Sequence, residues 1–145
     1  MAFDLPPIAK AAERLLVEIE QAVRAFPRCH KYVIGKDLRE QAMLVVRLCH
    51  RAWRDRSQQA RWTAELVWAI DELRLTVQLG SRIKAFRSFA QFEQLIRLVE
   101  DLGRQAGGWK RQQQQHLKGQ NPAREAAPER AQILSTCAAS TGANA

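Results

Sequence analysis

Cationic side chains are concentrated in one stretch of the chain, from Arg24 to Arg61. This stretch contains ten lysines and arginines and three acids, so it carries +7 of the formal net charge of +8. Its cations are Arg24, Arg28, Lys31, Lys36, Arg39, Arg47, Arg51, Arg54, Arg56 and Arg61. Arginine dominates, and its planar guanidinium group suits the geometry of a phosphate. A run of charge is often only a solvated helix surface, but this imbalance favours a polyanion partner.

Few residues have the types and spacing of a catalytic or metal site. Cys29 and His30 are adjacent, but no second ligand pair and no acid accompanies them, so a connector cysteine is the simpler interpretation. A di-iron bundle needs Glu-x-x-His pairs, and here proline, arginine and glutamine precede the three histidines at that spacing. Asp71 and Glu72 are neighbours and point in different directions. There is no phosphate-binding glycine loop. We therefore expect no catalytic residues, no metal and no cofactor.

Length and composition indicate a single globular domain. The chain has 145 residues, of which 46% are apolar, and this is enough for a substantial core. Apolar runs are too short to cross a membrane, and charged residues interrupt the first segment, so no signal peptide is expected. Three cysteines without a CxxC pair indicate reduced thiols. We expect a cytoplasmic protein without membrane contact.

Apolar residues at helical spacing predict four helices and an all-α, antiparallel four-helix bundle. The first spans about Pro6 to Ala25, because prolines suit the first turn and Pro27 ends the helix. The second and third helices span residues 36–54 and 57–84. The fourth begins near Ser88, where Ser88 and Gln91 fit a capping box. The expected core stripe of the fourth helix is Phe89, Phe92, Leu95, Ile96, Val99, Leu102, Ala106 and Trp109.

The second predicted helix has one apolar and one basic side. The apolar side comprises Leu38, Ala42, Val45, Val46, Cys49, Ala52 and Trp53. The basic side comprises Lys36, Arg39, Arg47, His50, Arg51 and Arg54. Gly35, just before this helix, is expected to supply either a positive φ or a close approach. Trp53 could stack on bases, but its place on the apolar side favours burial.

The third predicted helix carries two apolar stripes. One consists of Trp62, Leu66, Ala69, Ile70, Leu73 and Val77. The second, Trp68, Leu75 and Leu79, lies on a different side of the helix. A monomeric bundle buries one stripe per helix, so the second stripe predicts contact with another subunit.

The composition changes after Gln115. Proline, glycine, alanine and small polar residues replace the apolar periodicity, which is typical of a disordered segment. We therefore predict a four-helix bundle over residues 1–115 and a disordered tail over residues 116–145.

Two short motifs resemble those of a known family. Phe26-Pro27-Arg28, Lys31-Tyr32, Ile34-Gly35 and Leu38-Arg39 resemble the connector of the accessory variability determinant (Avd) proteins of diversity-generating retroelements. Leu102-Gly103-Arg104 followed by Gly107-Gly108-Trp109 resembles the end of helix four in that family. The resemblance covers about residues 9–111. Related four-helix proteins encoded within ribosomal RNA intervening sequences share the connector.

The resemblance implies a fold, an assembly and partners. Members of the family are four-helix bundles that form homopentameric barrels with a basic surface. They bind the element's reverse transcriptase and its template RNA and support mutagenic cDNA synthesis. For this chain, cDNA is a further candidate ligand. The alternative is an intervening-sequence type of bundle that scaffolds proteins and binds nucleic acid weakly.

The residues expected to contact RNA or reverse transcriptase are all basic. They are Arg28, Lys31, Lys36, Arg39, Arg47, Arg51, Arg54, Arg74 and Arg104. The residues expected at the contact between subunits are apolar, and they are Trp68, Leu75 and Leu79.

Overall fold

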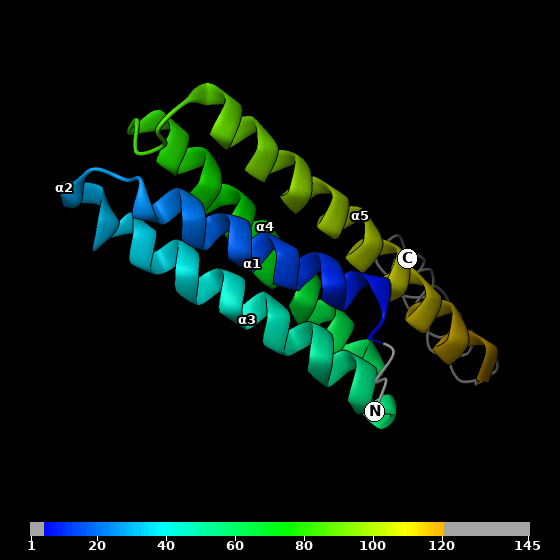
Figure 1. Ribbon diagram of the computed structural model, residues 1–145. Helices are drawn as coiled ribbons and strands as arrows, with labels where there is room; N and C mark the ends of the chain where they lie inside the picture. Colours follow the sequence, from blue (N-terminus) through cyan, green and yellow to red (C-terminus); the bar gives the residue numbers. More distant parts are fainter. Residues whose placement is uncertain (1–4, 121–145) are drawn as a thin grey trace, which may run out of the picture. The chain divides into compact units, whose positions relative to one another are not determined.

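The computed structural model describes residues 5–120, and this part of the chain is helical and contains no strand (Figure 1). The four long helices are α1 (Pro7–Arg24), α3 (Ile34–Arg54), α4 (Gln59–Arg82) and α5 (Phe89–Gln120). A short helix α2 (Arg28–Lys31) connects α1 to α3, and a 3₁₀ turn η1 (Arg56–Gln58) connects α3 to α4. The predicted all-α class is therefore confirmed, with helix bounds within two residues of those expected for the first three long helices.

The chain divides into two units after Arg111, and the first of them is a helical bundle. Within this unit, successive long helices run in opposite directions (Figure 1). α3 packs against both α1 and α4. α5 is joined to α1 by a hydrogen bond from Gln94 to Glu18 of 3.4 Å.

One apolar stripe from each long helix forms the core, as the helical periodicity predicts. Its largest fully buried side chains are Leu15, Ile19, Leu38, Leu66, Ile70, Leu73, Leu95 and Leu102. Two buried threonines also lie in α4, and each satisfies its hydroxyl locally. Thr63 donates to the carbonyl of Gln59 at 2.8 Å, and Thr76 donates to that of Glu72 at 3.0 Å.

Two aromatic residues assigned to the core by periodicity lie outside it. Trp53 is 44% exposed, and Phe89 is 73% exposed. Both lie at helix ends, Trp53 in the last turn of α3 and Phe89 at the first position of α5. A wheel projection treats every turn alike, whereas a terminal turn has neighbours on fewer sides. The expected burial of both side chains is therefore wrong.

Gly35 permits a close approach between α1 and α3. It lies in the first turn of α3, and no glycine among the described residues has a positive φ. A Cβ atom at this position would lie 2.7 Å from Cγ1 of Val23. Of the two expected roles, the structure supports close packing of the helices and not a left-handed backbone.

Ser88 and Gln91 cap the start of α5 much as predicted. The Ser88 hydroxyl accepts a hydrogen bond from the Gln91 amide at 3.2 Å, while the Gln91 side chain accepts from the Arg87 amide at 3.2 Å. The reciprocal bond therefore reaches one residue farther back than in a standard capping box. At its other end α5 continues to Gln120, so residues 116–120, expected in the tail, are helical. The rest of the predicted tail lies outside the described residues.

Among the described helices, none has an apolar stretch long enough to span a membrane.

Candidate nucleic-acid interface

Three arginines occupy the outward side of the second half of α3, and we call Arg47, Arg51 and Arg54 the arginine row. All three are exposed, because the opposite side of the helix is buried in the core through Val45, Leu48 and Ala52. None of the three forms an ion pair with a described residue. Their spacing of four and three residues aligns them along one side of the helix, as the sequence predicted.

The first half of the same helix is different, because its cations are paired. Arg39 donates two hydrogen bonds to Glu20 of α1, at 2.7 and 3.1 Å. Lys36 lies 3.8 Å from the carboxylate of Glu40, one turn farther along α3. On the basic side expected over the whole helix, Lys36, Arg39 and His50 therefore have acidic partners, His50 with Glu13 at 3.2 Å. The three arginines of the arginine row have none among the described residues.

Arg28 and Lys31 lie far from the arginine row. They belong to α2, which precedes α3, whereas Arg54 is the last residue of α3. A helix of 21 residues is about 30 Å long at a rise of 1.5 Å per residue. The structure therefore does not bring the predicted cations into a single patch.

Arg51 also contacts an aromatic side chain at the junction of α3 and α4. Its guanidinium carbon lies 5.4 Å from the ring centroid of Trp62, and that of Arg61 lies 4.9 Å from the same ring. The Trp62 indole donates a hydrogen bond of 3.0 Å to Asp55. Hydrogen bonds from Ser57 and Trp62 lower the pKa of the Asp55 carboxyl below its usual value. The middle member of the arginine row therefore also lies over an aromatic ring.

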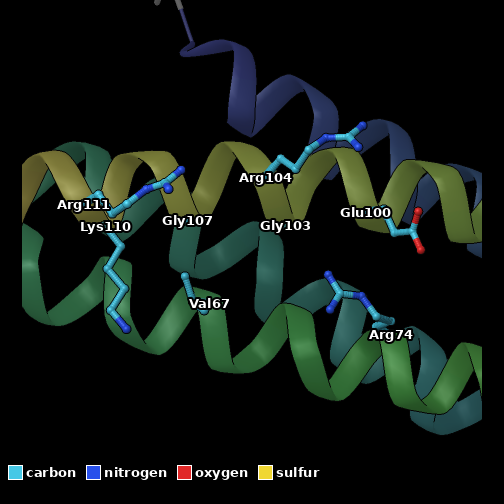
Figure 2. Close-up of a pocket in the computed structure, with 8 residues that line it drawn as sticks. All are labelled: Val67, Arg74, Glu100, Gly103, Arg104, Gly107, Lys110 and Arg111. Carbon is cyan, nitrogen blue, oxygen red and sulfur yellow. The ribbon is translucent and has the colours of Figure 1, made fainter.

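Arg74 and Arg104, also predicted as binding residues, contribute to a separate site, the α4–α5 groove. This hollow of about 690 Å³ is lined by Val67 and Arg74 of α4 and by Glu100, Arg104, Lys110 and Arg111 of α5. Figure 2 shows Arg74 reaching from α4 toward α5, and Lys110 reaching from α5 toward α4. Arg74 pairs with Asp71 at 3.3 Å, and Arg104 pairs with Asp101.

Lys110 and Arg111 were not among the predicted binding residues. A signal was present, because Lys110 follows Gly103 by seven residues and Arg111 follows Arg104 by seven. Two turns of helix separate residues at this spacing and place them on similar sides. The sequence alone does not show that Arg74 of α4 faces the same hollow.

Three exposed apolar side chains of α4 form what we call the apolar strip. Trp68 is 70% exposed, Leu75 56% and Leu79 43%. They lie on the side of α4 opposite the buried stripe of Leu66, Ile70 and Leu73. The predicted separation of the two stripes is correct, and the contact of the strip with another subunit stays a prediction.

Groups suited to nucleophilic or metal chemistry are sparse in the described part of the chain. Burial raises the pKa of the Cys49 thiol to about 12, so this thiol is protonated at neutral pH. Cys29 is exposed. Residues 5–120 contain no cluster of three histidine, cysteine or acidic side chains that could hold a metal ion.

No protein-family model matches the chain, and no curated protein has a significant sequence match to it.

Proposed function

We propose that this chain is a non-catalytic accessory protein of a diversity-generating retroelement. It binds the template RNA and the reverse transcriptase through a basic surface and supports mutagenic cDNA synthesis in the cytoplasm. The observation that carries the RNA-binding part is the arginine row, because three exposed guanidinium groups lie in line without carboxylate partners. The family and the reverse transcriptase rest on the resemblance of the connector and of the end of the last long helix.

The arginine row suits a phosphate backbone in both charge and spacing. Arg47 and Arg54 are seven residues apart, which corresponds to about 10 Å along α3. Guanidinium groups can donate two parallel hydrogen bonds to a phosphate. An extended row of such groups contacts the backbone without reading the bases, so we expect strong salt dependence and modest sequence preference.

We further propose that the protein acts as a closed ring of subunits, with five as the number implied by the resemblance. The apolar strip supports self-association, because contiguous exposed apolar side chains commonly mark interfaces. In a ring, each strip contacts a different surface of the next subunit, and rotation closes the assembly. The ring also repeats the arginine row, so one RNA can engage several rows and gain avidity.

The decisive experiment measures binding to the element's template RNA over a range of salt concentrations. Each phosphate contact contributes a slope of about −0.7 to a plot of log affinity against log salt for single strands. We expect a steep slope and weak discrimination against an RNA of scrambled sequence. Binding that is absent at low salt, or that does not change with salt, would contradict the proposal.

The second part of the experiment concerns the enzyme. Purified protein should retain the reverse transcriptase of the retroelement, and cDNA synthesis on the template RNA should depend on adding the protein. Retention without any effect on cDNA synthesis would favour the alternative function.

That alternative is an intervening-sequence type of scaffold that assembles proteins and binds nucleic acid weakly. The apolar strip favours it, because exposed apolar side chains serve protein contacts whether or not RNA is bound. The two functions differ in the role of the arginine row, which only the RNA-binding function requires.

A further inference from the structure

The α4–α5 groove is built around one glycine and one arginine. A Cβ atom on Gly103 would lie 2.8 Å from Nη2 of Arg74, so the guanidinium group lies directly against the α5 backbone. One turn later, a Cβ on Gly107 would have no atom within 4 Å. The first glycine thus admits the guanidinium group, and the second leaves the hollow open beside it.

Arg74 retains unused capacity to donate hydrogen bonds. Its Nη1 lies 3.3 Å from Asp71 Oδ1, but its buried Nε has no acceptor in the described structure. A buried donor without a partner is unfavourable, and guanidinium groups bind most strongly to anionic acceptors. An anion in the groove would meet a guanidinium group that the protein has not fully satisfied.

The charges around the groove favour an anion. Lys110 and Arg111 form no ion pair with a described residue, whereas the charges of Arg74 and Arg104 are partly offset by Asp71 and Asp101. Glu100 is the single acid that lines the hollow. The cations that reach between the two helices are Arg74 and Lys110 (Figure 2), so a polyanion that lies along the groove contacts one group from each helix.

We propose that the α4–α5 groove is a phosphate-binding site, distinct from the arginine row, that takes a phosphodiester of a bound RNA. Arg74 and Lys110 contact separate phosphates along the strand, with Arg111 and Arg104 at the outer edge. The identity of the ligand as RNA rests on the proposed function, whereas the phosphate chemistry rests on the groove itself.

The arrangement of the cations favours a strand over a single small anion. Gly103, against which Arg74 lies, and Lys110 are seven residues apart, or about 10 Å along α5. Arg74 and Lys110 are therefore spaced along the axis of α5 and do not surround a single position in the groove. A strand places successive phosphates along such a line, whereas inorganic phosphate contacts only one end of it.

The test compares substitutions inside the groove with matched changes outside it. Arg74→Gln and Lys110→Gln each remove one groove cation. Arg97→Gln removes an exposed cation that pairs with Glu93 on α5. Gly103→Ala places a methyl group 2.8 Å from Nη2 of Arg74, so the guanidinium group must shift, whereas Gly108→Ala on the same helix meets no atom within 4 Å. Alanine favours a helix more than glycine, so both replacements should preserve α5.

The readout is binding of a labelled single-stranded RNA to the full chain at several salt concentrations. Arg74→Gln and Lys110→Gln should each lower the magnitude of the salt slope by about 0.7, the contribution of one phosphate contact to a single strand. Gly103→Ala should weaken binding in the same direction, while Arg97→Gln and Gly108→Ala should leave it close to that of the wild type. Circular dichroism of each variant verifies that the helices are retained.

Competition separates the possible sources of the phosphate. Inorganic phosphate, a nucleoside monophosphate and an acidic peptide are each titrated against the bound RNA. If both phosphate compounds displace the RNA from the wild type but not from Arg74→Gln, the groove is a phosphate site. If neither compound displaces the RNA, and RNA binding still depends on Arg74, the ligand of the groove is a strand. Displacement by the acidic peptide alone would overturn the proposal in favour of a protein partner.

The same experiments distinguish failure of the groove proposal from failure of the proposed function. If substitutions in the arginine row abolish RNA binding while Arg74→Gln and Lys110→Gln leave it unchanged, the groove proposal is wrong and the proposed function stands. If the wild type binds inorganic phosphate, the groove variants bind it more weakly, and neither the wild type nor any variant binds RNA, then the phosphate site stands and the proposed function is wrong.

Discussion

The outward sides of α3 and α4 have opposite chemistry, although the two helices are neighbours in one bundle. α3 presents the arginine row to solvent, and α4 presents the apolar strip. On their inward sides the two helices are alike, since both bury aliphatic side chains in the same core. The core therefore does not explain the contrast between the outward sides.

The contrast indicates that the two surfaces have different partners. Exposed arginines are stable in water and need no cover, whereas a strip containing tryptophan and leucine gains free energy when it is covered. We therefore expect the apolar strip to contact protein and the arginine row to contact a polyanion. The predictions below begin with the largest expected effect.

Charging the apolar strip should disrupt the assembly. Leu75→Glu combined with Leu79→Glu places two carboxylates where each leucine is expected to contribute about 1.5–3 kcal/mol on burial. Light scattering should show a closed oligomer for the wild type and a smaller species for the variant, with helical content retained. Gln78→Glu, an exposed change on the same helix, is the control. A wild type that is monomeric at micromolar concentration would contradict the prediction that the apolar strip forms a contact between subunits.

Neutralising the arginine row should weaken RNA binding without affecting assembly. Replacing Arg47, Arg51 and Arg54 with glutamine should lower the magnitude of the salt slope by about 2 for each subunit engaged, at about 0.7 per phosphate. The control replaces Arg24, Lys36 and Arg97, which pair with Glu20, Glu40 and Glu93, and so makes the same change in net charge. Equal losses in the two triple variants would mean that only total charge matters.

One glycine on the inward side of each helix allows the packing of α3 and α4 against their neighbours to be compared. A Cβ on Gly35 of α3 would lie 2.7 Å from Val23, and one on Gly80 of α4 would lie 3.0 Å from the ring of Phe86. Val23 is fully buried and β-branched, so it cannot move easily, whereas Phe86 is only partly buried. Gly35→Ala should therefore lower the free energy of unfolding by about 1–3 kcal/mol, and Gly80→Ala by less. Chemical denaturation measures both, and the reverse order would show that the α1–α3 contact is the more adaptable one.

The smallest effect concerns Asp55, which lies between the two helices. Hydrogen bonds from Ser57 and Trp62 lower its pKa in the folded protein. A lowered pKa stabilises the fold above the ordinary pKa of the carboxyl, and this contribution disappears as the pH falls through the folded value. Asp55→Asn should therefore reduce the melting temperature slightly at neutral pH and less in acid. A reduction of equal size at both pH values would show that the ionised form has no special role.

The periodicity of the sequence predicts much of this fold and part of the site. Leu38, Val45 and Cys49 are buried as expected, and Arg47, Arg51 and Arg54 are exposed, because each position depends only on its angle around one helix. The predicted burial of side chains in terminal turns is wrong, as Trp53 and Phe89 show. The pairing of Arg39 with Glu20 depends on two segments nineteen positions apart, so no local pattern indicates it.

By itself, the sequence determined the number of long helices, the separation of the two stripes of α4 and the position of the α3 cations on one side of that helix. These properties follow from the 3.6-residue period and from proline and serine at helix ends, which act over a few residues. Only the tertiary structure decided which cations are neutralised and which meet across a groove. Arg74 and Lys110 lie on different helices, and Gly103 matters only because α4 brings a guanidinium group against it. Such contacts depend on how two helices are placed side by side, and the pattern along either helix does not contain that information.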